Sequence, residues 1–150
     1  MWNGKAYFFS APSGTGKTTQ LRLWKKLFKD EVEIMNGDKP ILEITDTSIL
    51  VHSSPWKGKE KMGRDDITAP LGGIIFLRQD QCNVIQRLDP KEAAGMLFGR
   101  SYTTFSTEQE VILNAQMLEK ILKTVPVWLL RNKGDIESAI ITSRALTEAL

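Results

Sequence analysis

The feature that most constrains this chain is a glycine-rich stretch near its start, set between an apolar run and a helical pattern. Residues 11–18 read Ala-Pro-Ser-Gly-Thr-Gly-Lys-Thr. They match the phosphate-binding pattern G-x-x-x-x-G-K-[ST] at every fixed position except the first, where Ala11 replaces glycine. Residues 6–10 predict a buried strand and residues 18–28 predict a helix. Strand, loop and helix therefore follow in the order that a phosphate-binding loop requires.

Each residue type in this stretch has a defined use in such a loop. Gly14 and Gly16 let the backbone turn its N–H groups around an anion, and the following helix adds the positive end of its dipole. Lys17 is expected to reach the β- and γ-phosphates, and Thr18 to hold Mg²⁺. The alternative is an ordinary glycine- and serine-rich turn, which the run Gly-Lys-Thr-Thr disfavours. The expected nucleotide-binding residues are Ser13, Gly14, Thr15, Gly16, Lys17, Thr18 and Thr19.

Length and composition indicate the class of protein. The chain has 150 residues, of which 41% are hydrophobic and 25% charged, as in a globular domain. A net charge of +2 does not favour nucleic acid or a membrane surface as a partner. The single cysteine excludes an internal disulfide, and no apolar run approaches the roughly 20 residues that cross a bilayer. We therefore expect one cytoplasmic domain over residues 1–150, with neither nucleic acid nor membrane as a partner.

The hydrophobic pattern predicts a mixed α/β domain around a central sheet. A hairpin is expected with its turn at Asp46 and Thr47, and a long polar loop over residues 53–70. Asp89 is expected to cap one helix, and Thr107 with Glu110 to form the capping box of another. Further strands are expected at residues 31–35, 41–45, 48–52, 72–77, 83–88 and 127–130, with the fifth beside the fourth, and further helices at residues 91–98, 107–125 and 136–150. The second of these helices is expected to bury Val111, Ala115, Leu118, Leu122 and Val125.

A phosphate-binding loop needs a nearby carboxylate to complete the magnesium shell. Asp38 follows an apolar run and is the best candidate, although Asn-Gly-Asp-Lys-Pro also fits a plain turn. The basic segment 54–61 and Arg64 are candidates for the cationic clamp that phosphoryl transfer needs. The alternatives are a solvated basic loop or, less favoured, a site for single-stranded nucleic acid. His52 is interpreted as structural. The expected catalytic residues are Lys17, Asp38 and Arg64, and the expected metal ligands are Thr18 and Asp38.

Several segments together resemble a known family. The glycine stretch is followed by Ile-Met-Asn-Gly-Asp-Lys-Pro, Ser-Pro-Trp-Lys-Gly-Lys and Ala-Pro-Leu-Gly-Gly-Ile-Ile-Phe-Leu. This order resembles proteins related to the catalytic domain of HPr kinase/phosphorylase, above all the short HPr-kinase-like group, over nearly the whole chain. The resemblance implies a P-loop nucleotide-binding domain with a phosphoenolpyruvate carboxykinase-like fold and a mixed, partly antiparallel sheet. It also implies ATP with Mg²⁺, transfer of the γ-phosphate to a hydroxyl, peptide or protein acceptor, and a loop shaped by Trp56, Lys57 and Lys59.

The chain also departs from that family. The related proteins generally carry two adjacent aspartates before Lys-Pro, where this chain has Gly37 and Asp38. HPr kinases place a catalytic histidine before the phosphate loop, and this chain shows none there. Two hypotheses follow: an ATP-dependent kinase that acts on a hydroxyl group, or a nucleotide-binding regulatory module that has lost catalysis. The residues leave open the phosphate acceptor, the choice between ATP and GTP, the oligomeric state, and whether the chain is a whole protein.

Overall fold

A 12-residue strand, β4 (Thr68–Gln79), organises the sheet. The computed structural model describes residues 1–58, 61–100 and 107–149, and within them β4 pairs with three other strands. Two of these, β1 and β6, run parallel to β4, whereas β3 runs antiparallel to it. The antiparallel pairs β2–β3 and β5–β6 complete a mixed six-stranded sheet. The other strands are β1 (Ala6–Ser10), β2 (Ile41–Ile44), β3 (Ile49–His52), β5 (Val84–Arg87) and β6 (Val127–Asn132).

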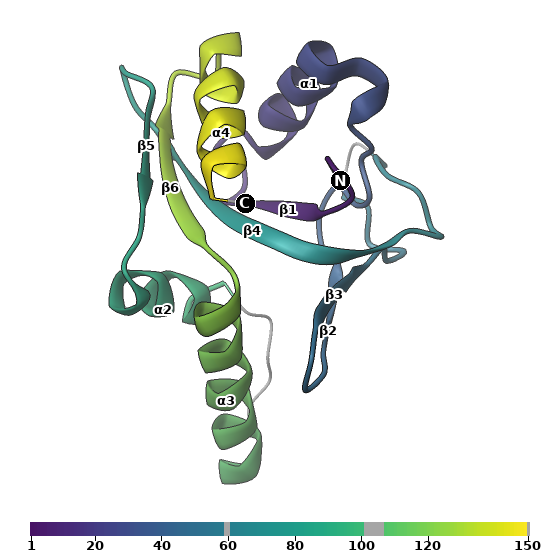
Figure 1. Ribbon diagram of the computed structural model, residues 1–150, viewed down its shortest axis with the longest axis vertical. Helices are drawn as coiled ribbons and strands as arrows, with labels where there is room; N and C mark the ends of the chain where they lie inside the picture. The colour runs from purple at the N-terminus through teal and green to yellow at the C-terminus, as the bar shows by residue number, and fades with distance from the viewer. Residues whose placement is uncertain (59–60, 101–106, 150) are drawn as a thin grey trace.

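Helices cover both faces of this sheet. Figure 1 shows α1 and α4 on one face and α2 and α3 on the other. Successive residues of β4 point to opposite faces, so Ile75 and Leu77 pack into the core beneath α1 and α4, whereas Ile74 and Phe76 pack into the second core. The helices are α1 (Lys17–Phe28), the short 3₁₀ helix η1 (Lys29–Glu31), α2 (Pro90–Phe98), α3 (Glu108–Thr124) and α4 (Ile136–Glu148).

An aromatic cluster fixes α1 against the sheet. Trp24 of α1 meets Trp2 edge-on, with ring centroids 5.3 Å apart, and Phe28 packs against both rings. Trp24 is only 3% exposed. Aromatic pairs in this geometry stabilise beyond the area that they bury. The start of α1, and with it the glycine stretch, is therefore held in place from the far end of the helix.

The elements with local sequence signals are confirmed. These include the first strand, the helix after the glycine stretch, the hairpin with its turn at residues 46–47, and the last strand and helix. Asp89 accepts hydrogen bonds from the N–H groups of Lys91 and Glu92, and a capping box forms there. Thr107 and Glu110 form the expected capping box of α3. The α/β class and the mixed sheet are thus as the sequence predicts.

The strand expected at residues 31–35 is wrong. Residues 29–31 form η1, and Val32 makes only an isolated bridge with Trp2. Val32 belongs to the core beneath α1 and α4, whereas Met35 belongs to the core on the other face. The apolar residues of this segment therefore belong to a coil that passes from one core to the other, and Val32 and Met35 are not part of a β-strand.

Two further expectations need correction at the sheet. Strand β5 does not lie beside β4, because β6 lies between them and pairs with both. Three of its four residues are exposed, which suits the edge of a sheet better than its centre. The loop expected at residues 53–70 ends before Thr68, where β4 begins. Its base is closed by the Ser53 N–H, which donates to the Ile67 carbonyl at 3.0 Å.

The buried face of α3 is also different from the expected one. Val111 is 46% exposed and Ala115 is exposed, whereas Asn114 and Ile121 are buried. Leu118 and Leu122 are partly buried against the core, and Val125 is buried as expected. The face that contacts the core thus runs through residues 114, 118 and 121, which differs from the expected stripe at its first two positions.

Candidate functional site

Three parallel strands bring their carboxyl ends to one edge of the sheet. Ile74, Ile75 and Phe76 of β4 pair with β1 along one edge and with β6 along the other. Strands β1, β4 and β6 therefore lie side by side, and they end at Ser10, Gln79 and Asn132. In open α/β sheets, ligands bind in the crevice outside the carboxyl ends of the strands. The segments that follow these three strands are the first place to look for a site.

The segment after β1 is residues 11–18, which we call the glycine loop. Gly14 has φ +81° and Gly16 has φ +109°, conformations that residues with a Cβ rarely adopt. A Cβ built at either position would meet nothing within 4 Å, so the requirement for glycine is conformational. The Lys17 ammonium group donates to the Ala11 carbonyl at 2.8 Å, which folds the side chain back over the loop.

The start of α1 differs from that of the other α-helices in the described ranges. Asp89, Thr107 and Asp135 cap α2, α3 and α4 with side-chain hydrogen bonds, and each of these helices has an acidic residue in its first turn. Helix α1 begins after Gly16 with no side-chain cap and no acidic residue in its first turn. Its first N–H groups and the positive end of its dipole are thus open to an external anion.

A cavity of about 410 Å³ lies against the glycine loop, and we call it the lysine cavity. One wall is the loop and the first turn of α1, and the other comes from residues 37–38, 57–58 and 62. It brings Lys17 and Thr18 together with Asp38 and Lys57. The residues that line it are Ser13, Gly14, Gly16, Lys17, Thr18, Thr19, Gly37, Asp38, Lys57, Gly58 and Met62.

Side-chain hydrogen bonds hold Asp38 in this wall. The Asn36 side chain accepts from the Asp38 N–H at 2.8 Å and donates to the Ser54 carbonyl at 3.0 Å. The buried Ser54 hydroxyl in turn donates to the Lys39 carbonyl and accepts from the Trp56 N–H. The two coil segments are thus joined to each other, and Asp38 lies at their junction beside the glycine loop.

Gly37 is required by the close approach of these two segments. A Cβ at this position would lie 2.6 Å from the Lys57 carbonyl oxygen and 3.2 Å from that of Met62. Real Cβ atoms do not approach backbone that closely, so any larger residue displaces the backbone at Lys57 and Met62. Gly37 is therefore part of how this wall packs.

The basic segment contributes one of its expected cations to the cavity. The Lys57 ammonium lies 2.8 Å from an Asp65 carboxylate oxygen and lines the lysine cavity. Arg64 lines neither of the two cavities described here; it binds Glu33 at 2.6 Å and Asp66 at 3.1 Å, and these partners raise its pKa. Lys59 lies outside the described residues. Trp56 is 59% exposed.

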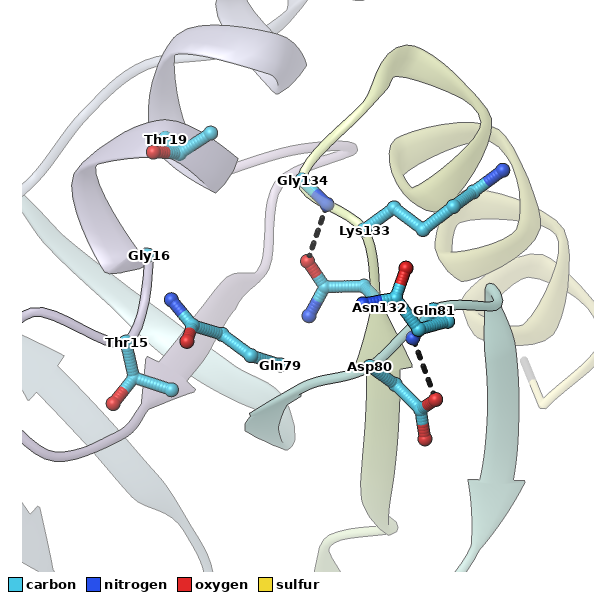
Figure 2. Close-up of a pocket in the computed structure, with 9 residues that line it drawn as sticks. All are labelled: Thr15, Gly16, Thr19, Gln79, Asp80, Gln81, Asn132, Lys133 and Gly134. Carbon is cyan, nitrogen blue, oxygen red and sulfur yellow. Dashed lines mark hydrogen bonds between the residues drawn. The ribbon is translucent and has the colours of Figure 1, made fainter.

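A second cavity, of about 430 Å³, lies against the end of the glycine loop and the first turn of α1 (Figure 2). We call it the strand-end cavity, because the ends of β4 and β6 and the turns that follow them form its far wall. Gly16 and Thr19 line both cavities. The residues that line it are Thr15, Gly16, Thr19, Gln79, Asp80, Gln81, Asn132, Lys133 and Gly134.

A buried hydrogen-bond network supports this second cavity. The Asn132 side-chain oxygen accepts from the Gly134 N–H at 3.0 Å and from the Gln20 amide at 3.2 Å. The Asn132 amide donates to the Arg78 carbonyl at 3.3 Å. Gln20 is fully buried and also donates to the Ser138 hydroxyl at 2.7 Å. Asn132 therefore joins β4, β6, α1 and the start of α4 at one point.

The charged groups of the strand-end cavity are balanced by neighbours. The backbone N–H of Gln81 and the nearby Arg131 hold the pKa of Asp80 below its ordinary value, and Arg131 lies 3.2 Å from the carboxylate. The Lys133 ammonium lies 3.3 Å from Asp135, which raises the lysine pKa. Among the described residues, the side-chain amide of Gln81 has no hydrogen-bond partner. The wall thus offers both donors and acceptors without a large net charge.

The structure places most of the predicted site residues together. All of those in the glycine loop except Thr15 line the lysine cavity with Asp38, and Thr15 lines the strand-end cavity. Arg64 and His52 line neither; the His52 ring instead binds Glu43 and Thr68. Sequence reasoning missed the strand-end residues entirely. Their signal was the polar runs Gln-Asp-Gln and Asn-Lys-Gly-Asp directly after two buried strands.

Two further observations concern metals and membranes. Within residues 1–58, 61–100 and 107–149, no three His, Cys, Asp or Glu side chains form a group that could hold a metal ion. Over the same ranges, no helix has both the length and the apolar character needed to span a membrane.

Comparison of the chain with protein-family models, with curated proteins and with solved structures finds no match.

Proposed function

We propose that this protein binds a nucleoside triphosphate in the lysine cavity and transfers its γ-phosphoryl group to a hydroxyl acceptor. The observation that carries the proposal is that one cavity is lined by the glycine loop, Lys17, Thr18, Asp38 and Lys57. These residues come from three separate parts of the sequence, around residues 11–18, 38 and 57, and only folding brings them together. No single segment of the chain would suffice.

The anion-binding part of the proposal rests on the backbone. Gly14 and Gly16 have left-handed backbone conformations, and the first turn of α1, which has no side-chain cap, lines the cavity. Lys17 rests on the Ala11 carbonyl, from which it can swing to the β- and γ-phosphates. Lys57 adds a second cation from the opposite wall. Charge that develops on the transferred group would thus be stabilised from both sides.

The donor set also fits a magnesium ion. Mg²⁺ prefers oxygen ligands and is usually held by one or two carboxylates, with substrate phosphates and water completing its shell. The Thr18 hydroxyl and the Asp38 carboxylate are such donors, and both line the lysine cavity. When bound, the ion would neutralise charge on the β- and γ-phosphate oxygens. A site of this kind does not need three carboxylates of the protein.

In the proposed reaction, the acceptor oxygen forms a bond to the γ-phosphorus while the bond from that phosphorus to the bridging oxygen breaks. The nucleoside diphosphate leaves with the bridging oxygen, and the hydroxyl proton passes to solvent. Enzymatic phosphoryl transfer depends mainly on positioning and on electrostatic stabilisation. Lys17, Lys57 and the N–H groups of the loop would supply both functions.

We also propose that the fold is that of the HPr-kinase-like P-loop proteins, related to phosphoenolpyruvate carboxykinase. The mixed sheet, with an antiparallel hairpin attached to its central strand, supports this proposal. The alternative function, a nucleotide-binding module without catalysis, is favoured by one observation. Gly37 packs against the Lys57 carbonyl at the position where the HPr-kinase-like proteins that the sequence resembles carry a first aspartate, so the wall provides one carboxylate where theirs provides two.

Calorimetric titration tests the binding step. Wild-type protein should bind ATP in the presence of Mg²⁺ and more weakly in the presence of a chelator. Lys17→Ala should lower the affinity by at least about tenfold, because it removes the cation that reaches the phosphates. The matched control is Lys26→Ala, an exposed lysine of the same helix that lines neither cavity, which should bind like the wild type.

The outcomes separate the two candidate functions. Formation of ADP that depends on a hydroxyl-containing acceptor would support the kinase. Magnesium-dependent binding with no ADP formed, with any acceptor or with water, would support the regulatory module. Equal affinity of wild type and Lys17→Ala, or no binding by the wild type, would overturn both.

A further inference from the structure

We infer that the strand-end cavity takes the base and ribose of the same nucleotide whose phosphates bind in the lysine cavity. The inference rests on the proposed function and extends it, because it assigns the nucleoside end of the substrate to a particular wall of the protein. That wall is formed by residues 79–81 and 132–134, which lie far from the glycine loop in the sequence.

The first argument is continuity. Gly16 and Thr19 line both cavities, so the two spaces meet at the first turn of α1. A nucleotide bound to the N–H groups of this turn has its phosphates in one space and its nucleoside within reach of the other. The strand-end cavity has a volume of about 430 Å³, which lies in the usual range for small-molecule sites.

The second argument is charge, which fixes the direction of the nucleotide. The lysine cavity is lined by two cations, Lys17 and Lys57, against one carboxylate, Asp38, so its lining is net positive and suits the triphosphate. The strand-end cavity is lined by one carboxylate, Asp80, and one cation, Lys133, so its lining is neutral and attracts a triphosphate less. A nucleoside is uncharged and carries N–H and O–H donors that a carboxylate accepts. The opposite orientation would place the triphosphate in the cavity whose lining has no net positive charge.

The third argument is the chemistry of the wall. In Figure 2 the Gln79 side chain extends from the end of β4 toward Thr15 and Gly16, where a ribose or base would lie. Gln81 offers an amide without a partner in the described parts of the chain, and Lys133 offers its alkyl stem because its ammonium is engaged with Asp135. A few polar groups on a preformed wall are what orients a small molecule.

The fourth argument is rigidity. Asn132 is 5% exposed and fixed by bonds to Gln20, Gly134 and the Arg78 carbonyl. The wall behind the proposed nucleoside is therefore set by the sheet before any ligand arrives. A preorganised wall reduces the entropic cost of binding.

Tripolyphosphate separates the two ends of the ligand, because it has the phosphates of ATP without the nucleoside. We would titrate Mg²⁺ complexes of ATP, GTP and tripolyphosphate into four proteins: wild type, Gln81→Trp, Gln79→Ala and the matched control Gln86→Trp. Gln81 is exposed in a turn, so an indole there fills the cavity without disturbing the core. Gln86 is exposed on β5 and lines neither cavity.

The expected result is a loss confined to nucleotides. Gln81→Trp should weaken ATP and GTP by at least about tenfold and leave tripolyphosphate within about twofold of wild type. Gln79→Ala also removes the bond from its amide to the Gly14 carbonyl, so it should weaken the nucleotides more than tripolyphosphate, and Gln86→Trp should bind all three ligands normally. A photoactivatable azidopurine nucleotide should label peptides that contain residues 79–83 or 131–135.

The contrary results are equally distinct. Nucleotide affinities within about twofold of wild type in both cavity variants, or labelling of other peptides, would overturn the assignment of the nucleoside end while the phosphate site stands. Wild-type protein that binds neither tripolyphosphate nor ATP would overturn the proposed function itself, and this inference with it.

Discussion

The two cavities beside the glycine loop are similar in size, at about 410 and 430 Å³, but their far walls are built differently. The far wall of the strand-end cavity consists of the ends of β4 and β6, which are paired in parallel up to Gln79 and Asn132. The far wall of the lysine cavity is coil. It is held by the Lys39 N–H, which donates to the Trp56 carbonyl at 3.2 Å, and by the bonds of Asn36 to Ser54.

Because of this difference, we expect substitutions in one wall to affect mainly the free energy of unfolding and substitutions in the other to affect mainly ligand affinity. At the end of β6, Asn132 is buried and joined to three other segments, so its substitution should lower stability before it changes ligand binding, unlike substitution of the exposed Gln79 and Gln81. The wall of the lysine cavity is coil outside the sheet, so a substitution at Gly37 should move the backbone at Lys57 and Met62 and change binding with a smaller effect on folding. Three substitutions examine this contrast.

The largest effect on folding is expected from Asn132→Ala. The change leaves the buried Gln20 amide, the Gly134 N–H and the Arg78 carbonyl without their partner. It should lower the free energy of unfolding by about 1–3 kcal/mol, measured by urea denaturation. Gln86→Ala, at an exposed position of β5, should stay within about 0.5 kcal/mol of wild type. Equal stability of the two variants would show that the strand-end wall is not held as described.

An intermediate effect, on binding, is expected from Gly37→Ala. The added Cβ meets the Lys57 carbonyl, so the backbone at Lys57 and Met62 should shift and Mg–ATP affinity should fall by about threefold to tenfold in a calorimetric titration. The loss of stability should be smaller than for Asn132→Ala. Gly37→Asp should lower the affinity in the same way, because its Cβ meets the same Lys57 carbonyl and displaces the wall that a second carboxylate would need. Phosphotransfer by Gly37→Asp above the wild-type rate would contradict this steric argument and would support the missing aspartate as the cause of lost catalysis.

The smallest effect is expected from Arg64→Gln. The guanidinium is exposed and its partners Glu33 and Asp66 are partly or largely exposed, so their ion pairs contribute little in water. Mg–ATP affinity should stay within about twofold and unfolding within about 0.5 kcal/mol of wild type. A tenfold fall in the rate of phosphotransfer would instead support the catalytic role that the sequence predicts, and would require Arg64 to leave Glu33 during the reaction.

The sequence predicted those parts of the molecule that are encoded locally. Glycine at positions 14 and 16 has a conformational reason, and Asp89 and Thr107 cap their helices through residues two or three positions away. The hairpin at residues 46–47 is likewise encoded in one short segment. In each case the physical cause lies within a few residues of its effect.

The predictions that proved wrong or incomplete concern features that depend on residues distant in the sequence. Nothing near β5 states that β6 will lie between it and β4, and the apolar residues Val32 and Met35 cannot reveal that they enter different cores. The same limit applies to the site. Asp38 could be paired with the glycine loop by chemical need, whereas Lys133 could not, because its role depends on which strand lies beside β4.

Because β4 pairs with both the early strand β1 and the late strand β6, the residues of the two cavities are synthesised at different times. All residues of the lysine cavity lie before residue 63, whereas the strand-end cavity needs residues 132–134. Chains are synthesised from the N-terminus at about 5–20 residues per second. A nascent chain that has left the ribosome only up to the end of α2 therefore contains every residue that lines the lysine cavity. It still lacks β6, which pairs with one edge of β4, and residues 132–134, which line the strand-end cavity.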